Sequence, residues 1–219
     1  MAEGRSFNIV ANEVCVEYEE KKSKFYGYTK YIKNEQQAND YIDLLWQAHP
    51  QATHICYAFI LGQQGEITKN NDNGEPAGTA GIPIQEAIRK RGLTNTIVAV
   101  VRYFGGKELG ASGLYKAYSR TTLDTLSAAS YYIMEECAVY EFKFSYNEFA
   151  KVGAYLRDNN YPALRIEYLD IVRAEIAIPV SKEQFVFSEL KMMLNGKVIN
   201  NKLRTAYFRF DPPKDKKGK

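Results

Sequence analysis

The alternation of apolar and polar positions divides the first half of the chain into strands and helices. Asn8–Val16 can supply an edge strand, and Lys24–Ile32 has the aromatic and β-branched composition typical of a strand. Asn34 then stands as a capping residue before apolar positions at helical spacing, which predicts a helix that ends near His49-Pro50. His54–Leu61 is apolar at successive positions, so we expect a central strand covered on both faces.

The next segment, Gly62–Gly81, shows no hydrophobic periodicity and is expected to be a loop. A loop of this length inside a compact domain is usually functional or disordered. Pro83 suits the first turn of a short helix that Gly92 can end. Ile97–Tyr103 predicts a buried strand, and a second glycine-rich loop then leads into a long helix over about Ser112–Ala129.

The pattern changes near residue 136. Aromatic and polar residues alternate over Tyr140–Tyr146, which predicts a strand with one wet face, and Asn147 is expected to cap the helix that follows. Two more alternating strands come next, then a capping box at Ser181-x-x-Gln184 ahead of a helix, and a last strand at Leu203–Phe210. The order β-α-β-β-α-β is that of the split βαβ, or ferredoxin-like, pattern.

The fold class expected from these patterns is therefore α+β, with two domains. Residues 1–136 form an N-terminal α/β domain, and residues 137–212 form a C-terminal ferredoxin-like domain. Residues 213–219 are expected to be a basic, disordered tail.

Composition places the chain among ordinary soluble globular proteins, with 45% hydrophobic and 25% charged residues. The net charge of +3 is small, and the basic excess lies in the second half. It allows contact with a polyanion, although for so small a charge a solvated surface is favoured. No apolar run is long enough to cross a bilayer, so no membrane contact is expected.

The three cysteines, Cys15, Cys56 and Cys137, are widely separated and form neither a CxxC pair nor a metal-ligand spacing. Met1–Asn8 lacks the apolar core of a signal peptide. Together these features predict a reduced, cytoplasmic compartment.

Candidate chemistry gathers in the two glycine-rich loops. The second loop follows a buried strand and opens a long helix, so its backbone N–H groups can form an anion cradle with Arg102 and Lys107 as charge partners. The alternative is a tight strand-to-helix turn that needs glycine only for its geometry. The candidate anion- or nucleic-acid-binding residues of both loops are Gly74, Glu75, Gly78, Thr79, Gly81, Arg102, Tyr103, Gly105, Gly106, Lys107, Gly110, Ser112 and Gly113.

The first loop also carries carboxylates, Asp72 and Glu75, with His54 on the strand before it. These three are weak catalytic candidates for acid–base chemistry, and they could hold a divalent cation. The alternative is that Asp72 stabilises a turn, Thr79 caps the following helix, and His54 is a hydrogen-bonded core residue. We expect no cofactor, with a divalent cation as the one exception.

Three motifs make the chain recognisable: His54-x-Cys56-Tyr57-Ala58, Asp72-x-Gly74-Glu75-Pro76-x-Gly78-Thr79-Ala80-Gly81-x-Pro83, and Val101-Arg102-Tyr103-Phe104-Gly105-Gly106-x-x-Leu109-Gly110. With them, the chain resembles the YigZ/IMPACT family in its bacterial two-domain form. It departs from the family pattern at Asn73, where members often have a second Asp, and at Ser112, where Gly is usual.

The resemblance implies an N-terminal domain similar to domain IV of elongation factor G and a C-terminal domain similar to its domain V. It also implies a role in translation, since eukaryotic members are translation regulators that act through protein partners. Bacterial members are expected to bind RNA or ribosomes.

Three functional hypotheses follow. The leading one is a non-enzymatic RNA- or ribosome-associated regulator of translation that binds through the glycine-rich loops and has a translation-related partner. On this hypothesis Tyr103 and Phe104 stack on bases, unless they belong to the core. The second is a phosphate- or metal-dependent hydrolase using His54, Asp72, Glu75 and Arg102. The third is a protein-interaction module whose loops dock a partner.

Overall fold

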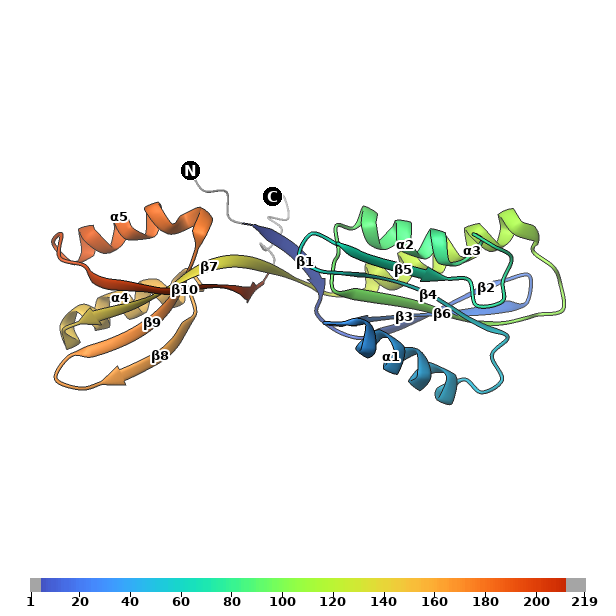
Figure 1. Ribbon diagram of the computed structural model, residues 1–219, viewed down its shortest axis with the longest axis horizontal. Coiled ribbons are helices and arrows are strands. Elements are labelled where there is room, and N and C mark those ends of the chain that lie inside the picture. Colours follow the sequence, from blue (N-terminus) through green and yellow to red (C-terminus); the bar gives the residue numbers. More distant parts are fainter. Residues whose placement is uncertain (1–4, 212–219) are drawn as a thin grey trace, which may run out of the picture. The chain divides into compact units, whose positions relative to one another are not determined.

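The computed structural model describes residues 5–211, and these form two compact units: a first unit of Phe7–Ile133 with Asp211, and a second unit of Met134–Phe210 with Arg5 and Ser6. Each unit combines a β-sheet with helices, so the fold class is α+β (Figure 1). In chain order, the elements up to the start of the second unit are β1 (Ser6–Val10), β2 (Val14–Glu20), β3 (Ser23–Tyr31), α1 (Glu35–Ala48), β4 (His54–Leu61), β5 (Ile67–Asn71), α2 (Gly81–Lys90), β6 (Thr96–Tyr103) and α3 (Gly110–Ala128).

The sheet of the first unit has the strand order β2-β3-β6-β4-β5, with antiparallel neighbours throughout. Helix α1 covers one face and helices α2 and α3 cover the other (Figure 1). Because successive side chains of a strand point to opposite faces, β6 supplies both cores. Val98 and Val100 pack toward α2 and α3, whereas Ile97, Ala99 and Val101 pack toward α1. This double coverage explains why β4 and β6 are apolar at successive positions.

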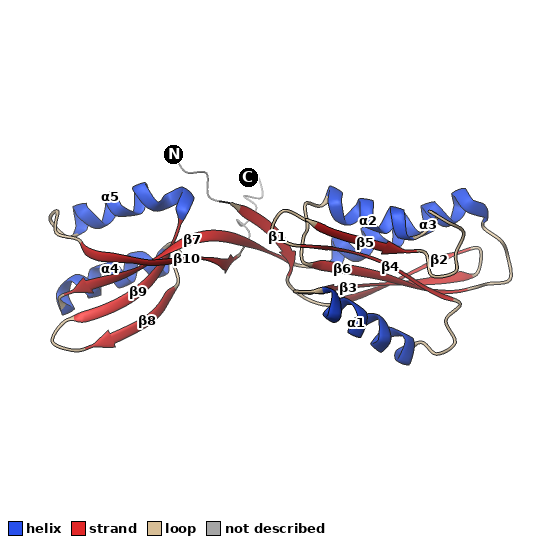
Figure 2. Cartoon of the chain, viewed as in Figure 1, coloured by secondary structure: helices blue, strands red, loops and turns tan. Residues whose placement is uncertain are grey.

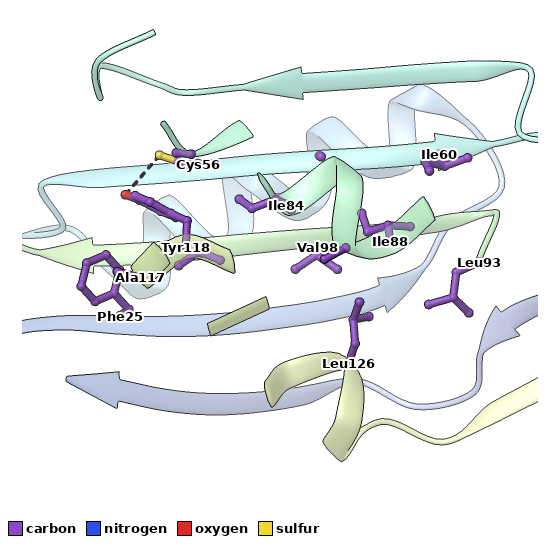
Figure 3. Packing of buried hydrophobic residues seen from close by; sticks show 14 of the residues in the cluster. Phe25, Cys56, Ile60, Ile84, Ile88, Leu93, Val98, Ala117, Tyr118 and Leu126 are labelled. Atoms are coloured by element: carbon purple, nitrogen blue, oxygen red, sulfur yellow. Dashed lines mark hydrogen bonds between the residues drawn. The ribbon is translucent and has the colours of Figure 1, made fainter. Parts of the chain in front are cut away.

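The core under α2 and α3 is drawn in Figure 3. Ile84 and Ile88 of α2 and Leu126 of α3 lie over Val98 and its neighbours on the sheet. At one end of this core, polar atoms enter: the Cys56 thiol donates a hydrogen bond to the Tyr118 hydroxyl, with a Sγ–Oη distance of 3.3 Å. Buried polar groups therefore adjoin the apolar core at this end.

The sequence prediction of one unbroken loop over Gly62–Gly81 is wrong in its middle. Ile67–Asn71 forms the edge strand β5, which pairs antiparallel with β4. All five of its residues are exposed. Its sequence, Ile-Thr-Lys-Asn-Asn, does not alternate between apolar and polar residues, so periodicity could not reveal it.

The second unit follows the expected β-α-β-β-α-β order, and Figure 2 distinguishes its helices from its strands. Its elements are β7 (Tyr131–Phe144), α4 (Tyr146–Asp158), β8 (Ala163–Tyr168), β9 (Val172–Pro179), the 3-10 turn η1 (Val180–Lys182), α5 (Glu183–Met193) and β10 (Ile199–Phe210). The strand order is β10-β7-β9-β8, and β1 also belongs to this sheet. Apolar residues of β7 and β9 pack against Val152 of α4 and Leu190 of α5.

Both helix starts in this unit differ from the sequence prediction. Helix α4 is capped by Ser145, which forms a capping box with Glu148, rather than by Asn147. The expected box at Ser181-x-x-Gln184 does not form, because Ser181 lies inside the turn η1 and α5 begins only at Glu183. Capping needs an extended residue before the first turn, and a 3-10 turn removes that geometry.

The division between the units falls inside strand β7, which begins at Tyr131 and runs to Phe144. The sequence boundary at residue 136 lies in the same strand. The expected basic tail at 213–219 falls outside the described residues. Over residues 5–211, no helix is both long enough and apolar enough to cross a membrane.

The core of the second unit gives a direct test of its packing. Phe142 of β7 is fully buried and stacks on Phe144. Phe142→Ala should lower the free energy of unfolding by about 3 to 5 kcal/mol, because it removes a large buried ring and leaves a cavity. Phe185→Ala, in a position 59% exposed on α5, is the matched control and should change stability little. Denaturant unfolding measures both, and equal losses would contradict this core assignment.

Candidate functional site

The register of three strands builds the base of the site. In the central strand β6, Arg102 pairs with Phe25 of β3 on one side and with His54 of β4 on the other. Paired residues of neighbouring strands point to the same face of a sheet, so all three side chains face α3. The sheet therefore places a cation, an aromatic ring and an imidazole in one row.

Arg102 is buried and forms an ion pair with Glu75. Its Nη1 donates to Glu75 Oε1 at 2.5 Å, and the two side chains are only 6% and 3% exposed. The Tyr118 hydroxyl donates to the same carboxylate oxygen at 2.8 Å. The guanidinium also lies between the rings of Phe25 and Phe104, 5.5 and 5.6 Å from their centres. Glu75 thus compensates the charge of Arg102, which otherwise would be costly to bury.

Asp72 stabilises the loop that contains Glu75. Its Oδ1 accepts hydrogen bonds from the backbone N–H groups of Ala80 and Gly81, at 2.9 and 2.8 Å, and its Oδ2 accepts one from Gly78 at 2.8 Å. Partial burial acts to raise the pKa of Asp72, but these three amides outweigh it and hold the pKa below its usual value. Asp72 therefore caps the start of α2 from the loop.

His54 has a defined tautomer when it is neutral. Its Nδ1 lies 3.0 Å from the backbone carbonyl oxygen of Asn73. A carbonyl can only accept, so Nδ1 carries the proton and Nε2 carries the free lone pair. Gly74 lies against the ring with a φ of +90°, and a Cβ there would come within 3.1 Å of Nδ1. Nε2 lies 4.0 Å from Glu75 Oε2.

An open cavity of about 350 Å³ lies above this cluster. Residues of both glycine-rich loops line it together with the start of α3: Thr53, His54, Glu75, Pro76, Arg102, Phe104, Glu108, Leu109, Gly110, Ala111 and Leu114. The Phe104 ring is 49% exposed. Within residues 5–211, no side chain caps the N-terminus of α3, whose residues Gly110 and Ala111 belong to the cavity lining.

The structure brings some predicted residues together and separates others. Glu75, Arg102, His54 and Gly110 line the same cavity. Tyr103 lies on the opposite face, because it follows Arg102 in the same strand, and its hydroxyl lies 2.8 Å from His49 Nδ1.

Other loop residues have mainly structural contacts. The Thr79 hydroxyl donates to the Pro76 carbonyl at 2.7 Å, so Thr79 does not cap α2 as the alternative interpretation expected. A Cβ at Gly105 would collide with the backbone of Lys22. Lys107 and Ser112 are exposed.

Sequence reasoning placed Tyr118 only on the apolar stripe of α3 and missed its role as a donor to Glu75. A tyrosine in a buried stripe is itself a signal, because its hydroxyl needs a hydrogen-bond partner. Among the described residues, no group of three His, Cys, Asp or Glu side chains gathers in a way that could hold a metal ion.

The fold and the loop-lined cavity define a two-unit α+β protein, and comparison with known proteins identifies its relatives. Residues 21–126 match the Impact N-terminal domain. The chain is 34% identical over 187 residues to IMPACT family member YvyE of Bacillus subtilis, covering 85% of this chain and 84% of that protein. It is 29% identical over 179 residues to IMPACT family member YigZ of Escherichia coli, covering 81% and 88%. The chain belongs to the IMPACT family.

Two solved structures are also similar. A crystal structure of a hypothetical protein has a TM-score of 0.58 at 27% identity, covering 91% of this chain and 98% of that chain. A structure described as the two-domain translational regulator Yih1 has a TM-score of 0.34 at 24% identity, covering 59% and 48%. The second score is too low to establish a common fold.

Asp72 provides a pH-dependent test of the loop. Asp72→Ala should lower the free energy of unfolding at pH 7 by about 1 to 2 kcal/mol, because a helix start loses its cap. The folded-state pKa of Asp72 lies below its usual value, so its contribution is complete above that value and is lost as pH falls through the folded pKa. The difference between wild type and variant should therefore shrink below about pH 4. Asp43→Ala, at an exposed position of α1, is the control, and a pH-independent difference would contradict the assignment.

The buried ion pair gives a second test. Arg102→Met should lower the free energy of unfolding by about 3 to 5 kcal/mol, because it leaves the Glu75 charge buried without its partner. Adding Glu75→Gln should recover a large share of this loss, since the remaining charge is removed. The exposed pair Arg165–Glu167 is the control, and Arg165→Met should cost less than about 1 kcal/mol. Chemical denaturation measures all three, and additive losses in the double variant would show that the two groups do not interact.

Proposed function

We propose that this chain is a non-enzymatic RNA- or ribosome-associated regulator of translation that binds RNA through the face formed by its two glycine-rich loops. The observation that carries the proposal is the half-exposed Phe104 ring, which lies over the Arg102 guanidinium at the side of an open cavity. Proteins recognise single-stranded RNA mainly by stacking unstacked bases on aromatic rings and guanidinium planes.

The same loop supplies the contact for phosphate. Lys107 is exposed, and the neighbouring Gly106, with a φ of +77°, borders open space: a Cβ there would meet no heavy atom of the described residues within 4 Å. Because Glu75 neutralises Arg102, the proposal assigns phosphate binding to Lys107 and base stacking to Phe104.

The translational role comes from the family. The proposal includes the expected likeness of the two units to domains IV and V of elongation factor G, and a translation-related protein partner. A shared fold does not by itself imply a shared function, so binding is the part to test first. The alternative as a hydrolase has less support, because Asp72, one of its named residues, has both carboxylate oxygens hydrogen-bonded to the backbone amides of Gly78, Ala80 and Gly81.

RNA binding can be tested with single-residue variants. Phe104→Ala should weaken binding of a single-stranded RNA by about 1 to 3 kcal/mol, since a stacking ring is lost. Lys107→Ala should weaken binding at all sequences alike and make the slope of log K against log salt shallower by about 0.7, as one phosphate contact is lost. Fluorescence anisotropy over a range of salt concentrations measures both.

Matched controls lie elsewhere on the chain. Lys33→Ala removes an exposed lysine beside α1, and Phe185→Ala removes an exposed ring on α5. Neither should change binding if the loop face is the binding surface. Co-sedimentation with ribosomal subunits, with and without nuclease, separates RNA binding from protein docking. Binding that resists nuclease and ignores both loop variants would refute the proposal in favour of a protein-interaction module.

A further inference from the structure

Two hydrogen-bond acceptors lie side by side in the cavity without a donor. Glu75 Oε1 already accepts from Arg102 and Tyr118, whereas Oε2 accepts no hydrogen bond from the described residues. In neutral His54, Nε2 carries the free lone pair, because Nδ1 donates to the Asn73 carbonyl. The two acceptor atoms are 4.0 Å apart, and both residues line the cavity. Two neighbouring acceptors require a ligand with two neighbouring donors.

The charges of the lining residues favour a neutral ligand over an anion inside the cavity. Glu75 and Glu108 carry negative charge, and the positive charge of Arg102 is already paired. A phosphate group would be repelled there, while a neutral ring with N–H donors would be attracted. Phe104 offers its exposed ring as a stacking wall, and a cavity of about 350 Å³ is within the size range of small-molecule sites.

Among the four RNA bases, only guanine presents two adjacent donor groups on its Watson–Crick edge, N1–H and the N2 amino group. Adenine and cytosine each present a single amino group, and uracil presents a single imino N–H. We infer that the cavity receives an unstacked guanine base of single-stranded RNA, with N1–H and the N2 amino group donating to Glu75 Oε2 and His54 Nε2. This inference rests on the proposed RNA-binding function. Phosphates remain outside the cavity, at Lys107.

Both acceptors are held in place by hydrogen bonds to the protein, which supports their role in selecting guanine. Arg102 and Tyr118 hold the Glu75 carboxylate from one side, and the Asn73 carbonyl holds the His54 ring. Neither acceptor can turn away without breaking a hydrogen bond, which is buried for Glu75 and partly buried for His54. Preorganised acceptors reject a ligand that lacks the matching donor, because they are left unpaired.

The test uses the wild-type protein and a change of one ligand group. Short single-stranded RNAs of one sequence carry guanosine, inosine or adenosine at a central position, and fluorescence anisotropy gives their affinities. Inosine lacks only the N2 amino group, so its RNA should bind roughly tenfold or more weakly than the guanosine RNA, because one hydrogen bond to a charged acceptor is lost. Adenosine lacks N1–H and the N2 amino group, presents only its N6 amino group on that edge, and should bind no better than inosine.

His54→Phe keeps a flat ring and removes the acceptor, so it should lose most of the guanosine preference. His49→Phe is the matched control, since His49 lies on the other face of the sheet between Tyr28 and Tyr103. If wild type binds all three RNAs equally well, the inference is wrong and the proposed RNA binding stands. A guanosine preference that survives His54→Phe unchanged would also overturn this assignment. If none of the RNAs binds, the proposed function itself fails.

Discussion

The buried pair of Arg102 and Glu75 is the interaction on which the loop face of the first unit depends. Burying an unpaired charge is far more costly than burying a satisfied pair, so each residue requires the other to be in place. Arg102 belongs to the central strand β6, while Glu75 belongs to a long loop. Tyr118 adds a contact from α3 to the same carboxylate. One carboxylate therefore joins strand, loop and helix at the same point.

This constraint also explains how a loop with few apolar residues can hold a defined shape. Asp72, at the beginning of the loop, accepts hydrogen bonds from three backbone amides at its end, those of Gly78, Ala80 and Gly81. Glu75 joins the middle of the loop to β6 through its ion pair with Arg102. Gly74 lets the loop backbone lie close to the His54 ring of β4. Polar contacts take the place of a hydrophobic core in this segment. The result is a preorganised wall for the cavity.

The functional consequence concerns charge. Arginine beside a glycine-rich loop suggests a phosphate site, but a guanidinium paired with a carboxylate has little charge left for an anion. In this unit, Arg102 is better suited to support the Phe104 ring and to position Glu75. Lys107, in contrast, lies on the exposed part of the loop. A separation of base and phosphate contacts is a common feature of single-strand recognition.

Sequence alone predicted the elements that have one or two buried faces. His54–Leu61 coincides with β4, and the helix predicted after Asn34 is α1, capped by that residue. The same reasoning missed β5, whose residues are all exposed, and it misplaced the cap of α4 by two residues. The exposed edge strand β5 carries no periodic pattern, whereas β8, also an edge strand and almost wholly exposed, keeps its alternation and could be predicted.

The candidate site, too, could be predicted only in part from the sequence. Residue types and motifs were enough to select Glu75, Arg102, His54 and the glycines of both loops, because glycine and charge without periodicity are unusual in a core. Only the tertiary structure decided that Glu75 neutralises Arg102 and that Asp72 is hydrogen-bonded at the start of α2. It also decided that Tyr103 lies on the face of the sheet opposite the cavity. Pairing across strands and between distant loops depends on register and on contacts far apart in the chain, and no local pattern encodes them. The sequence by itself determined which residues are candidates for the site; the fold determined which of them meet.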